Sequence, residues 1–164
     1  MDAYKTIENM MAIKYTKQTT TRKAIGDFML SDDHAVNVKS NNVDKQNYSP
    51  NMISIKKMHE WVYEQKKNLS FIFVDYKEDG SDIIILNESE PIPMEQISWN
   101  CLSIEAQGYG VIQKVKTLEV NQKLTKKDFY EGFLSAYEKY RNKEIRKHEK
   151  FSERFIKDVF LINW

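Results

Sequence analysis

Four consecutive apolar residues, Phe71-Ile72-Phe73-Val74, lie at the centre of the segment from Leu69 to Tyr76. Side chains alternate between the two faces of a strand, so an unbroken apolar run predicts a strand that is buried on both faces. Such a strand lies inside a sheet and has other elements packed on each side. The segment is therefore the central strand of the predicted fold.

The spacing of apolar and turn-forming residues predicts the other elements. Before the central strand, these are a helix from Tyr4 to about Tyr15, strands at Ile25 to Leu30 and Ala35 to Lys39 with a turn at Ser31-Asp32-Asp33-His34, a loop from Asn41 to Asn51, and a helix from Met52 to about Gln65. After it come strands at Asp82 to Leu86 and Val111 to Val115, an ambiguous segment from Ile97 to Ile104, a helix from Thr125, and a further helix or continuation from Glu144 to Phe160. Thr125 and Asp128 have the spacing of a helix-start box. We expect one α/β domain over residues 1–164, with a mixed central sheet flanked by helices and a long C-terminal helical segment.

Composition narrows the class of protein. The chain is 41% hydrophobic and 30% charged, which is typical of a soluble globular protein. No apolar run approaches the roughly 20 residues that cross a bilayer, so we expect a cytoplasmic protein without membrane contact. A single cysteine, Cys101, excludes an internal disulfide, and we expect it to be a small buried residue. The net charge of +1 does not indicate a partner.

Polar residues in the predicted hairpin suggest a catalytic site. Asn37 and Lys39 alternate with Val36 and Val38, so the polar pair points to one face of its strand. Pairing across the turn brings Asp27, on the first strand, next to them. A carboxylate that holds Mg²⁺ and a nearby ammonium that positions a water suit the hydrolysis of a phosphodiester.

This pattern resembles the PD-(D/E)xK, or restriction-endonuclease-like, superfamily of nucleases. Asp27 is similar to the first acidic residue of the family pattern, and Asn37-Val38-Lys39 is similar to its acid-x-Lys triplet. The resemblance implies a restriction-endonuclease-like core and Mg²⁺-dependent cleavage of double-stranded DNA, with a type II restriction endonuclease as the expected kind. It also implies that Asp27, Asn37 and Lys39 are catalytic, and that Glu8 and the carbonyl of Val38 join Asp27 and Asn37 as metal ligands.

Asn37 departs from the family pattern, which has Asp or Glu at this position. An amide oxygen can ligate Mg²⁺ but brings no negative charge. The affinity for the metal should therefore fall unless Glu8, Asp32 or Asp33 supplies the missing charge. Two alternatives therefore stay open: an exposed hairpin with ordinary polar side chains, and a catalytically inactive nuclease-fold module that binds DNA or a protein partner. A third is a small interaction protein whose partner surface is the aromatic late helix, with Phe151, Phe155 and Phe160.

Polar loops near the hairpin are candidates for DNA contact, because their side chains can bind phosphates or base edges. The two glutamines of the segment from Gln107 to Gln113 could make bidentate bonds to adenine, although a plain turn is the favoured interpretation of its glycines. The predicted DNA-binding residues are Thr20, Arg22, Lys23, Ser40, Asn41, Asn42, Lys45, Asn47, Gln107, Tyr109 and Gln113. Because cutting both strands takes two sites, we expect a homodimer on a palindromic target.

Two other features are assigned no chemistry. Basic residues from Arg141 to Arg154 are interleaved with glutamates, which predicts a solvated helix face with ion pairs. The three histidines lie in separate elements, and none is predicted to pair with a serine or Cys101 for nucleophilic catalysis or to form a zinc site.

Overall fold

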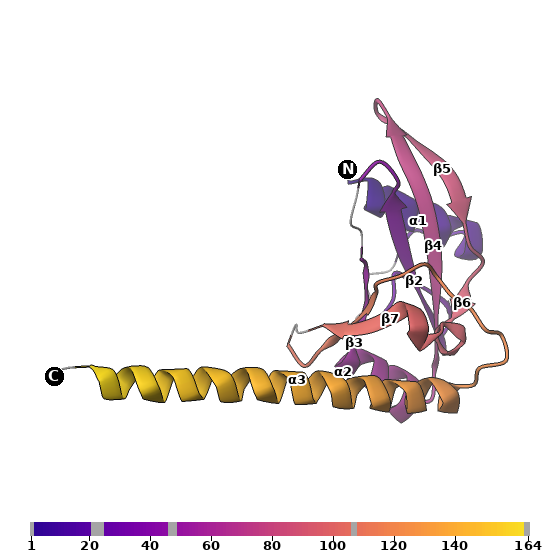
Figure 1. The fold of residues 1–164 in the computed structure, drawn as a ribbon. Coiled ribbons are helices and arrows are strands. Elements are labelled where there is room, and N and C mark those ends of the chain that lie inside the picture. The colour runs from indigo at the N-terminus through magenta and orange to yellow at the C-terminus, as the bar shows by residue number, and fades with distance from the viewer. Residues whose placement is uncertain (1, 21–24, 46–48, 106–107, 163–164) are drawn as a thin grey trace.

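The computed structural model describes the chain except for residues 1, 21–24, 46–48, 106–107 and 163–164. The fold is mixed α/β (Figure 1). Its strands are β1 (Phe28–Ser31), β2 (His34–Asn42), β3 (Asn51–Ser54), β4 (Asn68–Asp79), β5 (Asp82–Glu88), β6 (Ile92–Pro93), β7 (Leu102–Glu105) and β8 (Val111–Lys114). Its helices are α1 (Ala3–Thr16), α2 (Ile55–Met58), which continues as a π-helix (His59–Glu64), two 3₁₀ turns (Met94–Gln96 and Trp99–Cys101), and α3 (Lys126–Leu161).

The central sheet is mixed, as predicted. Its strands lie in the order β1-β2-β4-β5, and β6 also pairs with β4. β2 runs parallel to β4 over nine consecutive residue pairs, from His34–Asn68 to Asn42–Tyr76, whereas the other neighbours are antiparallel. The apolar run in β4 is central, because β2 pairs with one edge of that strand while β5 and β6 pair with the other.

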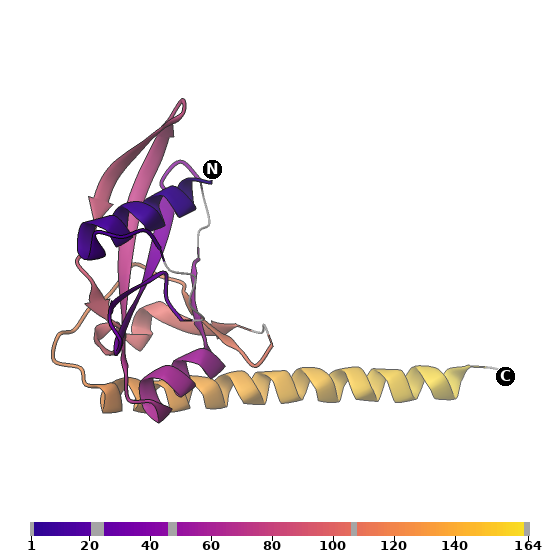
Figure 2. The same ribbon diagram turned by 180° about the vertical axis from the view of Figure 1, so that it is seen from behind.

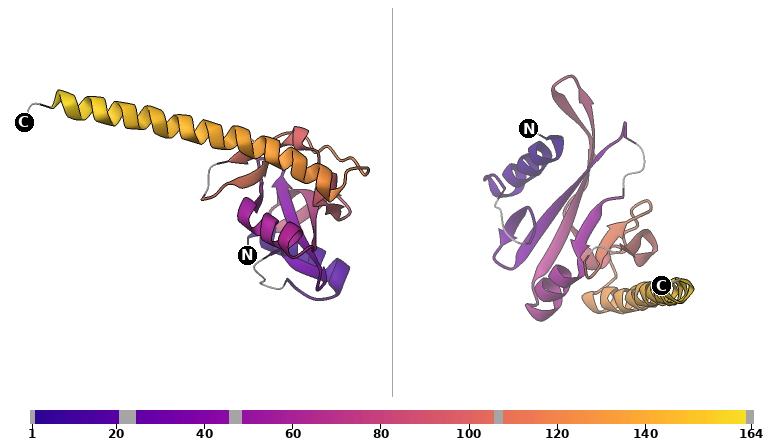
Figure 3. Two further views of the ribbon diagram at one scale, coloured as in Figure 1. Left: turned by 90° about the horizontal axis from the view of Figure 1, so that it is seen from below. Right: turned by 90° about the vertical axis from the view of Figure 1, so that its left-hand side faces the viewer.

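The two faces of the central sheet pack against different layers. α1 covers one face, as the views from behind and from the side show (Figures 2 and 3). The buried side chains between them are Ile7, Met11, Ala12, Phe28, Val36, Val38, Ile72, Val74 and Tyr76. The opposite face, with Phe71 and Leu69, packs against α2, the start of α3 and a second sheet.

The second sheet was not predicted. It has the order β3-β8-β7, with both pairs antiparallel. β3 contains Met52 and Ile53, which the sequence pattern had assigned to a helix, and both are buried. The helix begins only at Ile55, because Ser54 caps it by accepting a hydrogen bond from the backbone N–H of Lys57 at 3.3 Å.

The hairpin of β1 and β2 has a tighter turn than predicted. Ser31 pairs with His34, so the turn residues are Asp32 and Asp33, and an irregularity at Leu30 shifts the register. Phe28 consequently pairs with Val36. The first strand also begins at Phe28 rather than at Ile25, which leaves Asp27 immediately before it.

α3 is one unbroken helix. The predicted capping box is present: Thr125 accepts a hydrogen bond from the backbone N–H of Asp128, whose carboxylate accepts one from the backbone N–H of Thr125. Phe129 and Phe133 are buried against the second sheet. The helix then projects well beyond the rest of the molecule (Figure 1). Within the described residues, no helix combines the length and apolar character needed to span a membrane.

Candidate functional site

The carboxylate of Asp27 lies against the edge of β2. Pairing between β1 and β2 begins at Phe28, and the backbone N–H of Asp27 donates to the carbonyl of Val36 at 2.7 Å. Asp27 Oδ2 accepts a hydrogen bond from the backbone N–H of Val38 at 2.7 Å. The side chain of Asp27 thus provides the acceptor that a longer β1 would have supplied from its backbone.

The carbonyl of Val38 faces the same side as this carboxylate. In an extended strand the N–H and C=O groups of one residue point to the same neighbour. Because the N–H of Val38 points to Asp27, its carbonyl also lies on the Asp27 side of β2. Two oxygen donors, one charged and one neutral, therefore lie at this edge.

Asn37 and Lys39 project from β2 to the face opposite α1, as the alternation predicts. Both line a cavity of about 380 Å³ together with Gly26, the neighbour of Asp27. Their side chains are half-buried. Lys39 also lines an adjacent cavity of about 390 Å³, so its side chain lies between two hollows of the surface.

Glu8 approaches from the other face, on α1. Ile7 and Met11 bury one side of that helix against the sheet and leave Glu8 half-buried beside them. The pKa of Glu8 is raised to about 7, first by burial and then by the nearby charge of Asp27, while the charges of Lys39 and Lys5 oppose this shift. Glu8, Asp27 and Lys39 thus lie within electrostatic range of one another.

The pKa values of the other two groups show the same proximity. Burial raises the pKa of Asp27, against the hydrogen bond from Val38 and the charge of Lys39. Burial lowers the pKa of Lys39, against the charges of Asp27 and Glu8. The charges of the carboxylate and the ammonium therefore act on each other, although no ion pair joins the two groups and Lys39 leaves the strand on the face opposite α1.

This donor set suits a hard divalent cation. Mg²⁺ prefers oxygen ligands and is commonly held by one or two carboxylates, and here Glu8 and Asp27 provide two, with the carbonyl of Val38 alongside. Among the residues that the structure describes, no group of three or more His, Cys, Asp or Glu side chains could hold a metal. A cation at this edge would therefore depend on neutral oxygens and water for its remaining ligands.

The predicted DNA-binding residues are not all gathered around this site. Arg22, Lys23, Asn47 and Gln107 lie outside the described residues. Thr20 is held beside α1, because its N–H and hydroxyl both donate to Asn9 Oδ1, at 3.1 and 2.9 Å. Tyr109 is 79% exposed but lines a separate hollow with His59 and Tyr137.

The remaining candidates lie on or near β2 and β8. Asn41 lines the cavity of about 390 Å³ beside Lys39 and donates to Asp75 at 3.1 Å. Gln113 donates to Asn51 Oδ1 at 2.8 Å, and Asn51 lines the cavity that contains Asn37 and Lys39. Ser40 and Asn42 are half-buried in β2, and Lys45 is exposed beyond it.

Three polar residues of the cavity around Lys39 were missed. Asn51, Ser54 and Lys57 line it, but the sequence pattern had divided them between a loop and a helix. Ser54 was the available signal, because a serine before an apolar helical stretch is a typical N-cap. If the helix had been predicted to begin after Ser54, residues 51–53 could have been predicted as a strand.

One histidine does lie beside a serine, although no catalytic pair of this kind was predicted. His34 Nε2 lies 2.7 Å from Ser70 Oγ, because β2 and β4 are parallel neighbours in the central sheet. Ser70 is only 1% exposed, and burial lowers the pKa of His34. The pair therefore satisfies two polar groups inside the fold, where a substrate has no access.

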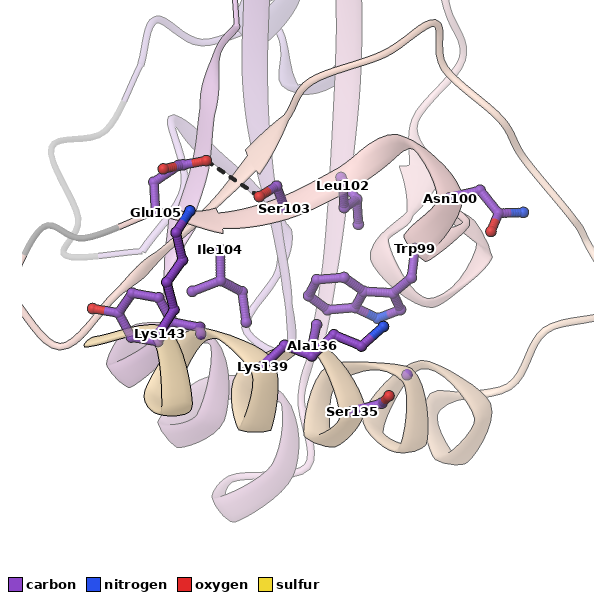
Figure 4. A pocket seen from close by; sticks show the side chains of 12 residues that line it. Trp99, Asn100, Leu102, Ser103, Ile104, Glu105, Ser135, Ala136, Lys139 and Lys143 are labelled. Atoms are coloured by element: carbon purple, nitrogen blue, oxygen red, sulfur yellow. Dashed lines mark hydrogen bonds between the residues drawn. The ribbon is translucent and has the colours of Figure 1, made fainter. Parts of the chain in front are cut away.

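A further cavity, of about 490 Å³, lies between β7 and α3 (Figure 4). Trp99, Lys139 and Lys143 are among its lining residues, and the hydroxyl of Ser103 donates to Glu105 at 3.2 Å on its rim. None of the predicted site residues lines it.

In comparisons with known proteins, no family model matches the chain, and no curated protein shows significant sequence similarity to it.

Proposed function

We propose that this protein is a Mg²⁺-dependent endonuclease that hydrolyses phosphodiester bonds of double-stranded DNA, with type II restriction as its expected role. One observation supports this above all: Glu8 on α1, Asp27 just before β1 and Lys39 on β2 are partly buried and lie within electrostatic range of one another. Buried charges of this kind are concentrated at functional sites. The restriction-endonuclease-like core and its family are part of the same proposal.

The residues of the site would divide the chemistry between them. Asp27 and Glu8 would hold Mg²⁺, with the carbonyl of Val38 and the amide of Asn37 as weaker ligands, and the bound ion would neutralise charge on the scissile phosphate. Lys39 would orient the attacking water through its N–H donors. The hydrogen bond from Val38 would keep the Asp27 carboxylate turned toward the ion.

The cavity on the Lys39 face has the chemistry of a DNA-backbone site. Its polar lining includes the ammonium groups of Lys39 and Lys57 and the amides of Asn37 and Asn51. Ammonium and amide groups are common donors to phosphate oxygens. A DNA strand lying there would place a phosphate beside Lys39, and a homodimer would bring one site to each strand.

Replacing Lys39 with Ala tests the assignment. We expect Lys39→Ala to lose Mg²⁺-dependent cleavage of a mixed plasmid substrate by a factor of about 10² or more, because removing one group that stabilises or positions the reaction commonly has this effect. Lys77→Ala is the matched control, since Lys77 is an exposed lysine on β4, and it should cleave like the wild type. Full activity in Lys39→Ala would refute the assignment.

A second function is favoured by the neutral Asn37. With two carboxylates at the site and no larger acidic cluster in the described part of the chain, a catalytically inactive module that binds DNA or a protein would also account for the fold. Titrating Mn²⁺ into wild type and Asp27→Asn by calorimetry separates the two. Metal binding that disappears in Asp27→Asn supports the nuclease; the absence of binding in both supports the inactive module.

A further inference from the structure

The outer half of α3 has no packing partner among the described residues. A helix of 36 residues is about 54 Å long, and Tyr140 is the last of its apolar residues to pack against the core. The remainder projects away from the sheets (Figures 1 and 3). Because most helical stability in proteins comes from packing of an apolar face, this segment needs a surface to pack against.

Several large apolar side chains of this segment are exposed to solvent. Phe151, Phe155 and Phe160 are 68%, 61% and 83% exposed, and Ile145 and Ile156 about half. Phe160 points away from the stripe described below. Since an aromatic side chain can bury about 150–250 Å², the four rings of Phe151 and Phe155 in two copies offer on the order of 500 Å². With Ile145, Ile156 and Ile162 of both copies, the total reaches the roughly 1,000 Å² of a specific interface.

The spacing of one set of residues matches the seam of a helix pair. Seam positions recur at alternating intervals of three and four residues. Here the helical seam positions are occupied by Ile145, His148, Ser152, Phe155 and Val159, and Ile162 follows just after the end of the helix. Such a narrow stripe suits a single partner helix.

The charges on this segment favour a second copy over nucleic acid or an anionic membrane. Residues 144–161 hold five Lys or Arg and four Asp or Glu, a net charge of +1 with histidine neutral. The two signs are interleaved, so two copies can approach without strong like-charge repulsion, whereas a polyanion would meet a carboxylate about every turn. One pair, Arg154 with Asp158 at 3.8 Å, is already formed within the helix.

We propose that the outer half of α3 is a dimerisation surface that pairs antiparallel with the same segment of a second copy. In this arrangement the large side chain of Phe155 packs over the small Ser152 of the second copy, and Val159 lies opposite His148. A parallel pair would instead set Ser152 against Ser152 and leave a gap between bulkier layers. The proposal does not depend on the nuclease function, although it would supply the two sites that double-strand cleavage requires.

Sedimentation of the full chain tests the surface. We expect wild type to have twice the 19.5 kDa mass of the chain at micromolar concentration, and Phe155→Glu to be monomeric. Leu161→Glu is the matched control: it places the same charge on an exposed apolar position, but on the side of the helix away from the seam, and should remain dimeric. Circular dichroism should show a folded body in both variants.

Any result other than these would contradict the proposed dimer. A wild-type monomer, a dimer that persists in Phe155→Glu, or a dimer lost equally in both variants would show that the seam does not form the dimer.

The orientation of the two helices is tested by mild oxidation of Ile145→Cys. The native Cys101 does not interfere, because it is buried. In the antiparallel pair the two introduced thiols lie about 25 Å apart, far beyond disulfide reach. A rapid intermolecular disulfide would show a parallel pair and overturn the arrangement.

Discussion

The protonation of Glu8 links the candidate site to the stability of the fold. Burial and the neighbouring Asp27 raise its pKa from the usual 4.5 to about 7. A carboxyl group whose pKa is raised on folding favours the native state when protonated. Its contribution is complete below about pH 4.5 and is lost as the pH rises to about 7. Without a cation, the site therefore opposes folding at neutral pH.

Replacing Glu8 with Gln should remove this pH dependence. In EDTA, we expect the melting temperature of Glu8→Gln relative to wild type to rise between pH 4.5 and pH 7.5, because only the wild type must bury a carboxylate there. Thermal unfolding followed by circular dichroism measures the difference at each pH. Glu78→Gln, at an exposed position on β4, is the matched control for the loss of a carboxylate that is not buried. A constant difference for Glu8→Gln would contradict the raised pKa.

Gly132 is required by the packing of Trp99 rather than by backbone conformation. A Cβ atom at Gly132 would lie 2.4 Å from Trp99 Cδ1. The indole cannot easily move away, because its N–H donates to the carbonyl of Phe129 at 3.0 Å and its ring packs on Phe129 with centroids 5.2 Å apart. The close contact between α3 and Trp99, which lies just before β7, thus depends on the absence of a side chain at Gly132.

Gly132→Ala should therefore destabilise the protein by about 1–3 kcal/mol, as overpacking of a filled site does. In a helix without this contact, the same change would stabilise by about 1 kcal/mol. Urea unfolding in a Trp99→Ala background tests the cause, since Gly132→Ala should become neutral or stabilising there. Destabilisation of the same size in both backgrounds would exclude the clash.

At the scale of elements, the sequence predicts what depends on neighbours in the chain. α1, β4 and the start of α3 are confirmed, because their apolar spacing and the Thr125–Asp128 box are local signals. β3 was missed, because Asn51–Ser54 becomes a strand through pairing with β8, about 60 residues later. In the candidate site, strand alternation predicted the faces of Asn37 and Lys39, whereas the place of Lys57 depended on the missed strand.

Loss of the cap at Thr125 should weaken the attachment of α3. We expect Thr125→Ala to lower the free energy of unfolding by about 1 kcal/mol, because the backbone N–H of Asp128 loses its acceptor. Thr125→Ser keeps the hydroxyl and should retain most of the stability. Chemical denaturation of the three proteins gives the comparison, and equal loss in both variants would mean that the methyl group matters rather than the cap.

At the scale of the whole molecule, β4 joins two cores. Phe71 contributes to the core under the second sheet, and Ile72 to the core under α1. The two side chains are adjacent in sequence and are both fully buried. One strand therefore couples the layer that holds Glu8 to the layer that holds α2 and α3.

Truncating either side chain should destabilise both layers together. We expect Phe71→Ala to cost about 3–5 kcal/mol and Ile72→Ala about 2–5 kcal/mol, each with one cooperative transition. Near-ultraviolet circular dichroism reports on Trp99, in the layer with the second sheet and α3. Hydrogen exchange of the backbone amides of α1 reports on the other layer. Separate unfolding of the two layers in either variant would show that β4 does not couple them.

The outer edge of β5 has a consequence for solubility. Among the strands that the structure describes, β5 has a neighbour on one side only, and its Ile84 and Leu86 are exposed. An uncovered apolar edge can recruit strands from other molecules into aggregates. Asp82 and Glu88 bracket this stretch, and Glu88 is paired with Lys14 of α1 at 3.2 Å. The carboxylate of Asp82 is therefore the charge that acts as a gatekeeper, and replacing Asp82 with a neutral residue would remove a barrier to aggregation at this edge.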